Sequence, residues 1–359
     1  MEKKRHPKVK CEFCQKWISK KNIAAHKAKE HPGKRISRVE RKKAIRKPKK
    51  LVIRNPGRPR RCDRISSIPG VELMGPHISS GSFGDVYKCL YNGELAAIKY
   101  ASENEIKNEV GIYQKIKECR NVVKLLAHDS CSMVLKYFPL SLEDYLSSRE
   151  KMKAPQKFLP IDEIKMIMKN ILIALADIHA VKVVHRDLKP SNILIDDEKN
   201  ICLCDFVYGK LIKPGTRSTP RVGHRVYRAP EILFMTNKAI YTDSVDIWAA
   251  GCVFFKLLAI EDLFEYQDER DKQAGEIARI IGTPGKPMMN RYFRDKFSKK
   301  YFMDIVKNQK GIKWESMISA HYDRKTIEEA AQLLSKMVCW DDKRRIRADE
   351  AIAHNFFQS

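Results

Sequence analysis

The spacing of apolar side chains changes along the chain, from a pattern typical of strands to one typical of helices. Residues 86–90 and 95–99 are two short, largely apolar runs that flank Asn92-Gly93. An Asn-Gly pair between two such runs predicts a tight β-hairpin. Between residues 164 and 178, apolar side chains recur every three or four positions, which places them on one face of a helix. Strands followed by helices predict an α+β domain with two lobes.

The most apolar run of the sequence covers residues 247–260 and is interrupted by Lys256. It is shorter than the roughly 20 residues that a membrane-spanning helix needs, so we expect a buried helix. The first residues, 1–6, are mostly charged or polar and no apolar stretch follows them, so a secretory signal is not expected. These patterns predict an intracellular protein whose ten cysteines stay reduced.

Positive charge is concentrated at the amino-terminal end. The 359 residues have a formal net charge of +26, and residues 1–64 contain 25 Lys and Arg against 5 Asp and Glu. The arm therefore carries +20 and the remainder +6, which is ordinary for a soluble domain. Neutralised phosphates release counterions, so a basic arm attracts polyanions, nucleic acid first and anionic membrane second. We expect DNA or chromatin as the partner of residues 1–64, and no membrane.

A cluster of metal-ligand residues lies within residues 8–34. Cys11 and Cys14 are separated by two residues, and His26 and His31 follow at a spacing that suits one tetrahedral Zn²⁺. The alternative interpretation is that the two cysteines are unrelated and the two histidines lie at the surface without binding metal. The spacing favours a C2H2-like zinc finger.

Residues 35–64 form a basic linker between this segment and a patterned domain at residues 65–358. Within the linker, residues 54–61 read Arg-Asn-Pro-Gly-Arg-Pro-Arg-Arg and resemble an AT-hook, whose extended core enters the minor groove of A·T-rich DNA. A solvated linker that acts as a nuclear-import sequence is the alternative interpretation. Both interpretations predict a nuclear protein, and we expect the arm to hold the large domain on chromatin.

A glycine-containing segment, residues 79–86, precedes the predicted hairpin. Glycine allows the backbone to fold over a triphosphate without obstruction by side chains, although a plain glycine turn explains the same residues. Lys99 ends the second strand of the hairpin, where its ammonium group could hold the α- and β-phosphates.

The most specific motif is His-Arg-Asp-Leu-Lys-Pro-Ser-Asn at residues 185–192, followed by Asp205-Phe206 and by Ala-Pro-Glu at 229–231. With this order and spacing, residues 65–358 resemble the eukaryotic protein kinases. The resemblance implies a bilobal protein kinase fold with a small β-rich N-lobe and a larger α-helical C-lobe. It also implies a serine/threonine protein kinase that uses ATP and Mg²⁺ and acts on protein substrates.

The resemblance implies roles for individual residues. Asp187 would accept the proton of the substrate hydroxyl, Lys189 would neutralise charge on the transferred group, and Asn192 and Asp205 would hold Mg²⁺. A lysine two residues after the catalytic aspartate is the serine/threonine form of this loop. The implied ATP site consists of Ser79, Gly81, Gly84, Val86, Ala97, Lys99, Glu109, Lys136 and Phe138.

Several further pairings follow from the same resemblance. Glu109 is expected to be the helix partner of Lys99, with Glu105 as the competitor because few residues separate Lys99 from Glu109. Glu231 is expected to pair with Arg345. Residues 246–251 are expected to form a buried helix that supports the catalytic loop.

Three residues depart from the family pattern. Ser79 replaces the first glycine of the loop, Val207 replaces the glycine after the Asp205-Phe206 pair, and His224 stands where a threonine usually braces the catalytic aspartate. Because valine does not take left-handed backbone angles as easily as glycine, we expect restricted switching of Asp205. A chromatin-tethered pseudokinase scaffold is therefore the alternative class.

Two kinase branches remain open. Residues 226–233, 246–252 and 281–284 are similar to the cyclin-dependent kinases, but the helix after Lys99 lacks the cyclin-binding sequence of that branch. Residues 221–231 and 134–138 resemble the cell division control protein 7 kinases, which fire replication origins, and this second resemblance is favoured.

Each branch implies different partners. The favoured one implies an activating regulatory subunit, replicative helicase subunits as substrates, and cell-cycle or DNA-replication control in the nucleus. The cyclin-dependent branch implies a role in transcription or the cell cycle and an activation-loop phosphosite at Thr219, with Thr216 and Ser218 as nearby candidates. The basic, aromatic segment 286–324 fits either a docking surface or an insert that packs on the lobe.

Overall fold

The computed structural model describes residues 8–10, 17–19, 67–81, 84–212, 223–234, 242–267, 269–292, 296–306 and 308–358. The chain divides into two compact units, Met1–Arg58 and Pro59–Ser359. In the first unit, β1 (Lys8–Lys10) and β2 (Trp17–Ser19) form an antiparallel pair. The four zinc-ligand candidates Cys11, Cys14, His26 and His31 lie outside the described residues. The zinc finger therefore stays a prediction.

The N-lobe of the second unit is a five-stranded antiparallel sheet in the order β3-β4-β5-β7-β6. Its strands are β3 (Val71–Gly81), β4 (Gly84–Tyr91), β5 (Glu94–Tyr100), β6 (Leu125–His128) and β7 (Ser132–Lys136). The predicted hairpin is present: β4 pairs with β5 through Asn92 and Gly93, which both have positive φ angles of 51° and 83°. Such angles suit a primed turn, which matches the twist of the two strands.

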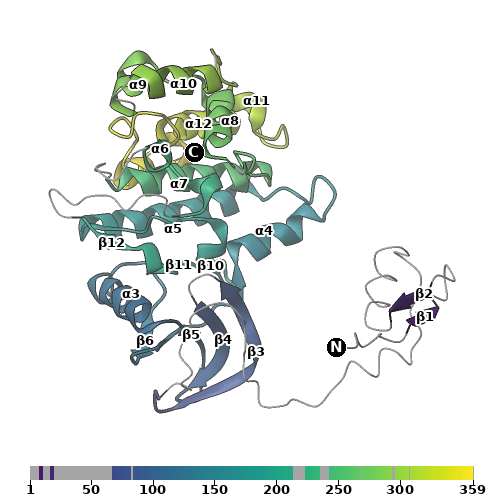
Figure 1. The fold of residues 1–359 in the computed structure, drawn as a ribbon, viewed down its shortest axis with the longest axis vertical. Helices are drawn as coiled ribbons and strands as arrows, with labels where there is room; N and C mark the ends of the chain where they lie inside the picture. Colours follow the sequence, from purple (N-terminus) through teal and green to yellow (C-terminus); the bar gives the residue numbers. More distant parts are fainter. Residues whose placement is uncertain are drawn as a thin grey trace, which may run out of the picture. The chain divides into compact units, whose positions relative to one another are not determined.

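One helix, α3 (Glu103–Lys115), packs beside this sheet (Figure 1). It begins with a capping box, in which Ser102 and Glu105 satisfy each other's backbone amides. Its buried side chains are Ile106, Glu109, Val110 and Tyr113. The helix therefore presents one glutamate to the interior, among apolar residues.

The C-lobe is mainly helical, as the sequence pattern predicted, and Figure 1 shows its helices stacked beyond the N-lobe sheet. Its longer helices are α4 (Leu142–Glu150), α5 (Ile161–Ala180), α7 (Ser244–Ala259), α8 (Arg270–Ile281), α9 (Lys286–Tyr292), α10 (Lys296–Val306) and α12 (Arg324–Met337). Shorter helices are η1 (Pro190–Asn192), η2 (Phe206–Tyr208), η3 (Arg225–Tyr227), α6 (Pro230–Phe234), α11 (Trp314–Met317), α13 (Ala348–Ile352) and η4 (Asn355–Phe357). Short strands are β8 (Leu140–Ser141), β9 (Val183–Val184), β10 (Ile193–Ile195), β11 (Ile201–Leu203) and β12 (Lys210–Leu211).

Helices α5 and α7 form the centre of this lobe. The apolar face predicted for residues 164–178 is buried in α5. Helix α7 is buried on all sides up to Leu258, and a Cβ on Gly251 would lie 2.5 Å from Val338, so glycine allows close packing there. None of the helices in the described ranges is long and apolar enough to cross a membrane.

Part of the basic, aromatic segment 286–324 packs against the body of the lobe. Met289, Tyr292 and Phe302 are buried, and the hydroxyl of Tyr292 donates to the carbonyl of Trp340 at 2.6 Å. Trp340 also contacts the rings of Tyr292 and Phe302. These contacts favour the packing interpretation for α9 and α10.

Candidate active site

A buried lysine joins the two lobes through two carboxylates. Lys99 Nζ lies 2.8 Å from Oε2 of Glu109 on α3 and 2.7 Å from Oδ1 of Asp205 in the C-lobe. The second oxygen of Glu109 accepts the backbone N–H of Phe206 at 3.1 Å. Burial alone would lower the pKa of Lys99, but the two carboxylates outweigh it and raise that pKa. Burial alone would raise the pKa of Asp205, but the ammonium of Lys99 outweighs it and lowers that pKa. Both groups therefore stay charged.

Of the two glutamates considered for Lys99, the structure places Glu109 at the ammonium group. Glu105 lies one helical turn earlier, where its carboxylate accepts from the backbone amide and hydroxyl of Ser102 at 3.0 and 2.6 Å. The sequence contained this information, because Ser-x-x-Glu at 102–105 is the spacing of a capping box.

The carboxylate of Asp187 is fixed from several directions. Nδ2 of Asn192 donates to the carbonyl oxygen and to Oδ2 of Asp187, at 2.8 and 3.1 Å. The backbone N–H of His224 donates to Oδ1 at 2.7 Å. Lys189 Nζ lies 3.4 Å from Oδ2. The structure therefore brings two predicted site residues, Lys189 and Asn192, to the carboxylate of Asp187, a residue that is 6% exposed.

His224 corrects the expectation about its position. In the family pattern a threonine side chain usually braces the catalytic aspartate at this position, and its replacement by histidine put the efficiency of the site in doubt. The brace is supplied by the His224 backbone amide, whereas the imidazole ring packs against Tyr227 and Tyr266. The effect of the histidine side chain on activity stays a prediction.

A second buried carboxylate, that of Asp246, binds the backbone of the loop that contains Asp187. Asp246, near the start of α7, accepts the backbone N–H groups of His185 and Arg186, each at 2.8 Å. It also contacts Nε2 of His179 at 3.0 Å. Burial would raise the pKa of Asp246, but the bond to His179 outweighs it and lowers that pKa. The supporting role predicted for residues 246–251 is thus visible, while His179 was not foreseen from the sequence.

Phe206 connects this loop to α3. Its ring is fully buried and lies 4.6 Å from the ring of His185 and 5.3 Å from that of Tyr113, centroid to centroid. Asp205 carries the left-handed backbone angle, with φ of 62°, and Val207 lies in the short helix η2. In this arrangement the valine has no unfavourable backbone angle. Val207 was predicted to restrict the switching of Asp205 to a different backbone arrangement, and this stays a prediction.

Several of the predicted nucleotide-binding residues lie on strands β3, β4 and β5 of the N-lobe sheet. Ser79 pairs with Val86 across β3 and β4, and Gly81 pairs with Gly84. A Cβ on Gly84, whose φ is 142°, would lie 2.4 Å from the carbonyl oxygen of Tyr100, so only glycine fits there. Val86 pairs directly with Lys99. These strand pairings therefore place Gly81, Gly84 and Lys99 towards one end of the sheet.

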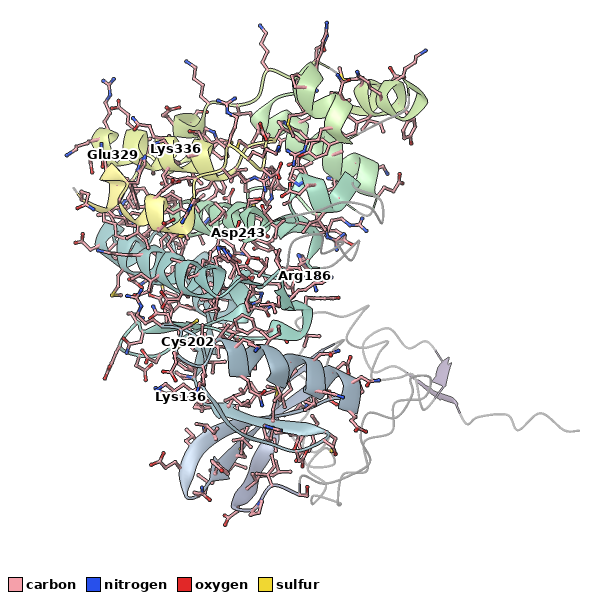
Figure 2. The ribbon with its side chains drawn as sticks, turned by 90° about the vertical axis from the view of Figure 1, so that its left-hand side faces the viewer. Lys136, Arg186, Cys202, Asp243, Glu329 and Lys336 are labelled. Carbon is pink, nitrogen blue, oxygen red and sulfur yellow. The ribbon has the colours of Figure 1, made fainter. Side chains whose placement is uncertain are left out.

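The remaining nucleotide-binding candidates lie where the two lobes join. Ala97 on β5 pairs with Leu135 on β7, and Lys136 ends β7 with an exposed side chain, followed by the buried Phe138. Figure 2 shows Lys136 and Cys202 at this junction. The phosphosite candidates Thr216, Ser218 and Thr219 lie outside the described residues.

The landmark pair predicted in the C-lobe is also present. Both guanidinium Nη atoms of Arg345 contact the carboxylate of Glu231, at 2.6 and 2.8 Å, and both side chains are buried. Arg345 also donates to the carbonyls of Ser244 and Cys339. The pair thereby ties α6 to the loop before α13.

Comparison with known proteins agrees with this geometry. Residues 74–357 match the family model described as protein kinase domain. One curated relative, the protein kinase gsk3 of Schizosaccharomyces pombe, is 32% identical over 300 residues, which cover 78% of this chain and 72% of the relative.

Proposed function

Because this chain belongs to the protein kinase family and is a protein serine/threonine kinase that uses ATP and Mg²⁺, we propose that Asp187 is its catalytic base and Lys99 its phosphate anchor. The observation that carries the proposal is the joint placement of two fixed groups. The Lys99 ammonium is bonded to Glu109 and Asp205, and the Asp187 carboxylate is oriented by Asn192 and the His224 amide. Phosphoryl transfer depends mainly on such positioning and charge neutralisation.

The proposed reaction assigns one task to each group. The serine or threonine hydroxyl gives its proton to Asp187 as its oxygen bonds to the γ-phosphorus of ATP, and the bond from that phosphorus to the β-phosphate oxygen breaks. Lys189, whose ammonium is 3.4 Å from Asp187, neutralises charge on the transferred group. Lys99 holds the phosphates that remain on ADP.

The donor chemistry of Asn192 and Asp205 fits a hard divalent cation. Nδ2 of Asn192 is directed at Asp187, so its amide oxygen is turned away from that carboxylate. Asp205 adds a charged carboxylate, and oxygen atoms are the ligands that Mg²⁺ prefers. When bound, Mg²⁺ neutralises phosphate charge.

This assignment is tested by titrating Mg²⁺ in a peptide phosphorylation assay. We expect Asn192→Ala to raise the Mg²⁺ concentration for half-maximal activity by about tenfold or more. Asn200→Ala, which removes the amide of an exposed turn asparagine, is the matched control and should leave it unchanged. An unchanged Mg²⁺ requirement in Asn192→Ala would remove this residue from the site.

The cellular role that we propose is control of the cell cycle or of DNA replication in the nucleus. It rests on the resemblance of residues 221–231 and 134–138 to cell division control protein 7 kinases and on the basic arm at residues 1–64. The proposal includes an activating regulatory subunit and replicative helicase subunits as substrates. Purification of the tagged chain from its cells is the test. A zinc-finger-bearing replication activator would support it, and a cyclin-like subunit would support the cyclin-dependent alternative instead.

For the arm we propose a zinc finger and a DNA tether. Cys11, Cys14, His26 and His31 would bind one Zn²⁺, and the AT-hook-like residues 54–61 would enter the minor groove. We expect metal analysis of the full chain to find about one zinc per molecule, lost in Cys11→Ser. Removal of residues 1–64 should abolish salt-sensitive DNA binding and leave peptide phosphorylation intact. DNA binding that survives this removal would refute the tether.

A further inference from the structure

The C-lobe contains a cavity of about 210 Å³ at the end remote from the N-lobe. It lies between the end of α8, the chain before α11, and the end of α12, and Figure 1 places these helices at the pole opposite the N-lobe sheet. Figure 2 labels Lys336, which follows the cavity residue Ser335, far from Lys136. We call it the α8–α12 cavity. Its lining residues are Ile280, Ile281, Lys310, Gly311, Ile312, Trp314, Ser335, Val338, Cys339 and Trp340.

Backbone contacts hold the walls of the α8–α12 cavity in place. The N–H of Ile312 donates to the carbonyl of Ile280 at 2.8 Å, and the indole N–H of Trp340 donates to the carbonyl of Gly282 at 2.8 Å. Gly311 has a φ of 78°, and a Cβ on it would lie 2.8 Å from the nitrogen of Gly282. Two chain segments therefore touch through their backbones, which forms the cavity before any ligand binds.

Most of the residues that line the cavity have apolar side chains, and one of these residues lies at the surface. Ile280, Val338 and Trp340 are buried, whereas the lining residue Ile312 remains 37% exposed. Burial raises the pKa of the Cys339 thiol, so this group stays neutral and behaves as part of the apolar wall. An apolar ligand group would gain contacts with two tryptophan rings.

The charges around the cavity are mainly positive. Lys310 is an exposed lining residue, and Arg344 is exposed and close enough to Cys339 to influence its pKa. Two acids are close enough to influence Cys339: Asp341, which is engaged by Arg291 at 3.4 Å and by the N–H of Lys343, and Glu231, which is paired with Arg345. The rim therefore suits an anionic partner.

Size distinguishes between classes of ligand. Sites for drug-sized molecules are usually about 300–1,000 Å³, which exceeds this cavity, whereas one aromatic side chain is about the right size. Anchor residues that fill such preformed pockets dominate many protein interfaces. We propose that the α8–α12 cavity is a docking site for one bulky apolar side chain of an acidic segment of a partner protein, whose carboxylates pair with Lys310 and Arg344.

Binding of a partner at this cavity would hold the partner on the kinase without taking part in phosphoryl transfer. Because none of its lining residues contacts the carboxylate of Asp187, a partner can stay bound there while substrate hydroxyls enter and leave the active site. The site would raise the local concentration of the partner's phosphorylation sites near the catalytic loop. Substrates that carry such a segment should therefore have a lower KM at an unchanged kcat.

The probe for this proposal is a short fluorescent peptide of Glu and Asp with one central phenylalanine, measured by anisotropy with the full chain. Replacing that phenylalanine by alanine should weaken binding about tenfold or more. Ser335→Trp, which places a large ring on an exposed lining position, and Lys310→Glu should weaken it similarly. Gln332→Trp and Lys300→Glu, exposed positions outside the lining, are the matched controls and should bind as the unaltered chain does.

A second measurement places the peptide in the cavity. Bound peptide should slow alkylation of Cys339 by N-ethylmaleimide, followed by mass spectrometry of the fragment that contains it. Any one of three outcomes would overturn the proposal. The first is that the peptide fails to bind the unaltered chain, the second that it binds Ser335→Trp and Lys310→Glu as tightly as the unaltered chain, and the third that bound peptide leaves the alkylation rate of Cys339 unchanged. Protection by sodium decanoate but not by the peptide would also overturn it, in favour of a lipid site. Phosphorylation of a peptide without the anchor should be unchanged in both variants, which separates this test from that of the active site.

Discussion

The backbone N–H of His224 donates a hydrogen bond to Oδ1 of Asp187 at 2.7 Å. A main-chain group therefore orients the carboxylate that we propose as the catalytic base, at a position where the family pattern usually has a threonine side chain. The φ of His224 is −74°, which is compatible with the ring of proline. Substitutions that change the side chain and those that remove the N–H should consequently have different effects.

We predict that His224→Ala and His224→Thr keep kcat within about threefold of the unaltered enzyme, because the amide remains. His224→Pro removes the donor and should lower kcat by about 10- to 100-fold, the value of a hydrogen bond to a charged acceptor. Steady-state kinetics at saturating ATP, with thermal unfolding to check the fold, measure both effects. A large loss in His224→Ala would assign the brace to the imidazole instead.

The two glutamates of α3 provide a matched comparison. Glu109→Gln weakens the anchor that holds Lys99, so kcat/KM for ATP should fall by about 100-fold. Glu105→Gln affects the capping box and should reduce the free energy of unfolding by at most about 1 kcal/mol, with activity nearly unchanged. If both variants lose activity equally, the helix as a whole and not the Glu109 carboxylate is responsible.

The features that could be predicted from the sequence are those encoded by local spacing. The Asn92-Gly93 turn and the apolar face of α5 follow from short-range patterns, and both are present. The choice between Glu105 and Glu109 was also encoded, through the capping-box spacing from Ser102, but requires the helix start to be identified first. Local spacing is sufficient where the interacting groups lie within one or two turns.

Other contacts could not be predicted because they join distant segments or use the main chain. His179 meets Asp246 across 67 residues, and no local pattern links them. The hydrogen bond from the His224 amide cannot be read from residue identities, because every residue except proline has a backbone N–H. Both contacts depend on how α5, α7 and the segment before η3 pack, which is a property of the folded lobe.

Removing one partner of a buried ion pair should destabilise the C-lobe. Arg345 and Glu231 are 0% and 1% exposed, so removing the cation leaves an unpaired buried carboxylate. Arg345→Met should reduce the free energy of unfolding by about 3–5 kcal/mol. Arg324→Ala breaks an exposed pair with Glu328 and should leave the free energy of unfolding nearly unchanged. Urea unfolding of both variants decides the matter, and equal effects would contradict this account.

Asp129 should give the N-lobe an acid-sensitive contribution to stability. Burial would raise its pKa, but hydrogen bonds from Cys131, Ser132 and Ser67 outweigh burial and lower the pKa from 3.8 to about 2. A depressed pKa stabilises the fold above the unfolded value and loses that effect as pH falls towards 2.

The corresponding variant is Asp129→Asn. It should be less stable by about 1 kcal/mol at pH 7, a value reduced for solvent screening because the side chain is partly exposed. The difference from the unaltered chain should be constant down to about pH 4 and shrink below it. Urea unfolding at a series of pH values measures the difference. A difference that stays constant through the acid range would rule out the ionised carboxylate as its source.

The most direct test of the central claim is the rate of phosphate transfer by Asp187→Asn. The purified chain, with ATP, Mg²⁺ and a serine- or threonine-containing protein substrate, is compared with Asp187→Asn and with Asp197→Asn, an exposed control. We predict that Asp187→Asn lowers kcat by about 10²- to 10⁴-fold, with KM for ATP and thermal stability nearly unchanged, while Asp197→Asn behaves as the unaltered chain. Transfer by Asp187→Asn at the unaltered rate would contradict the assignment of Asp187 as the catalytic base.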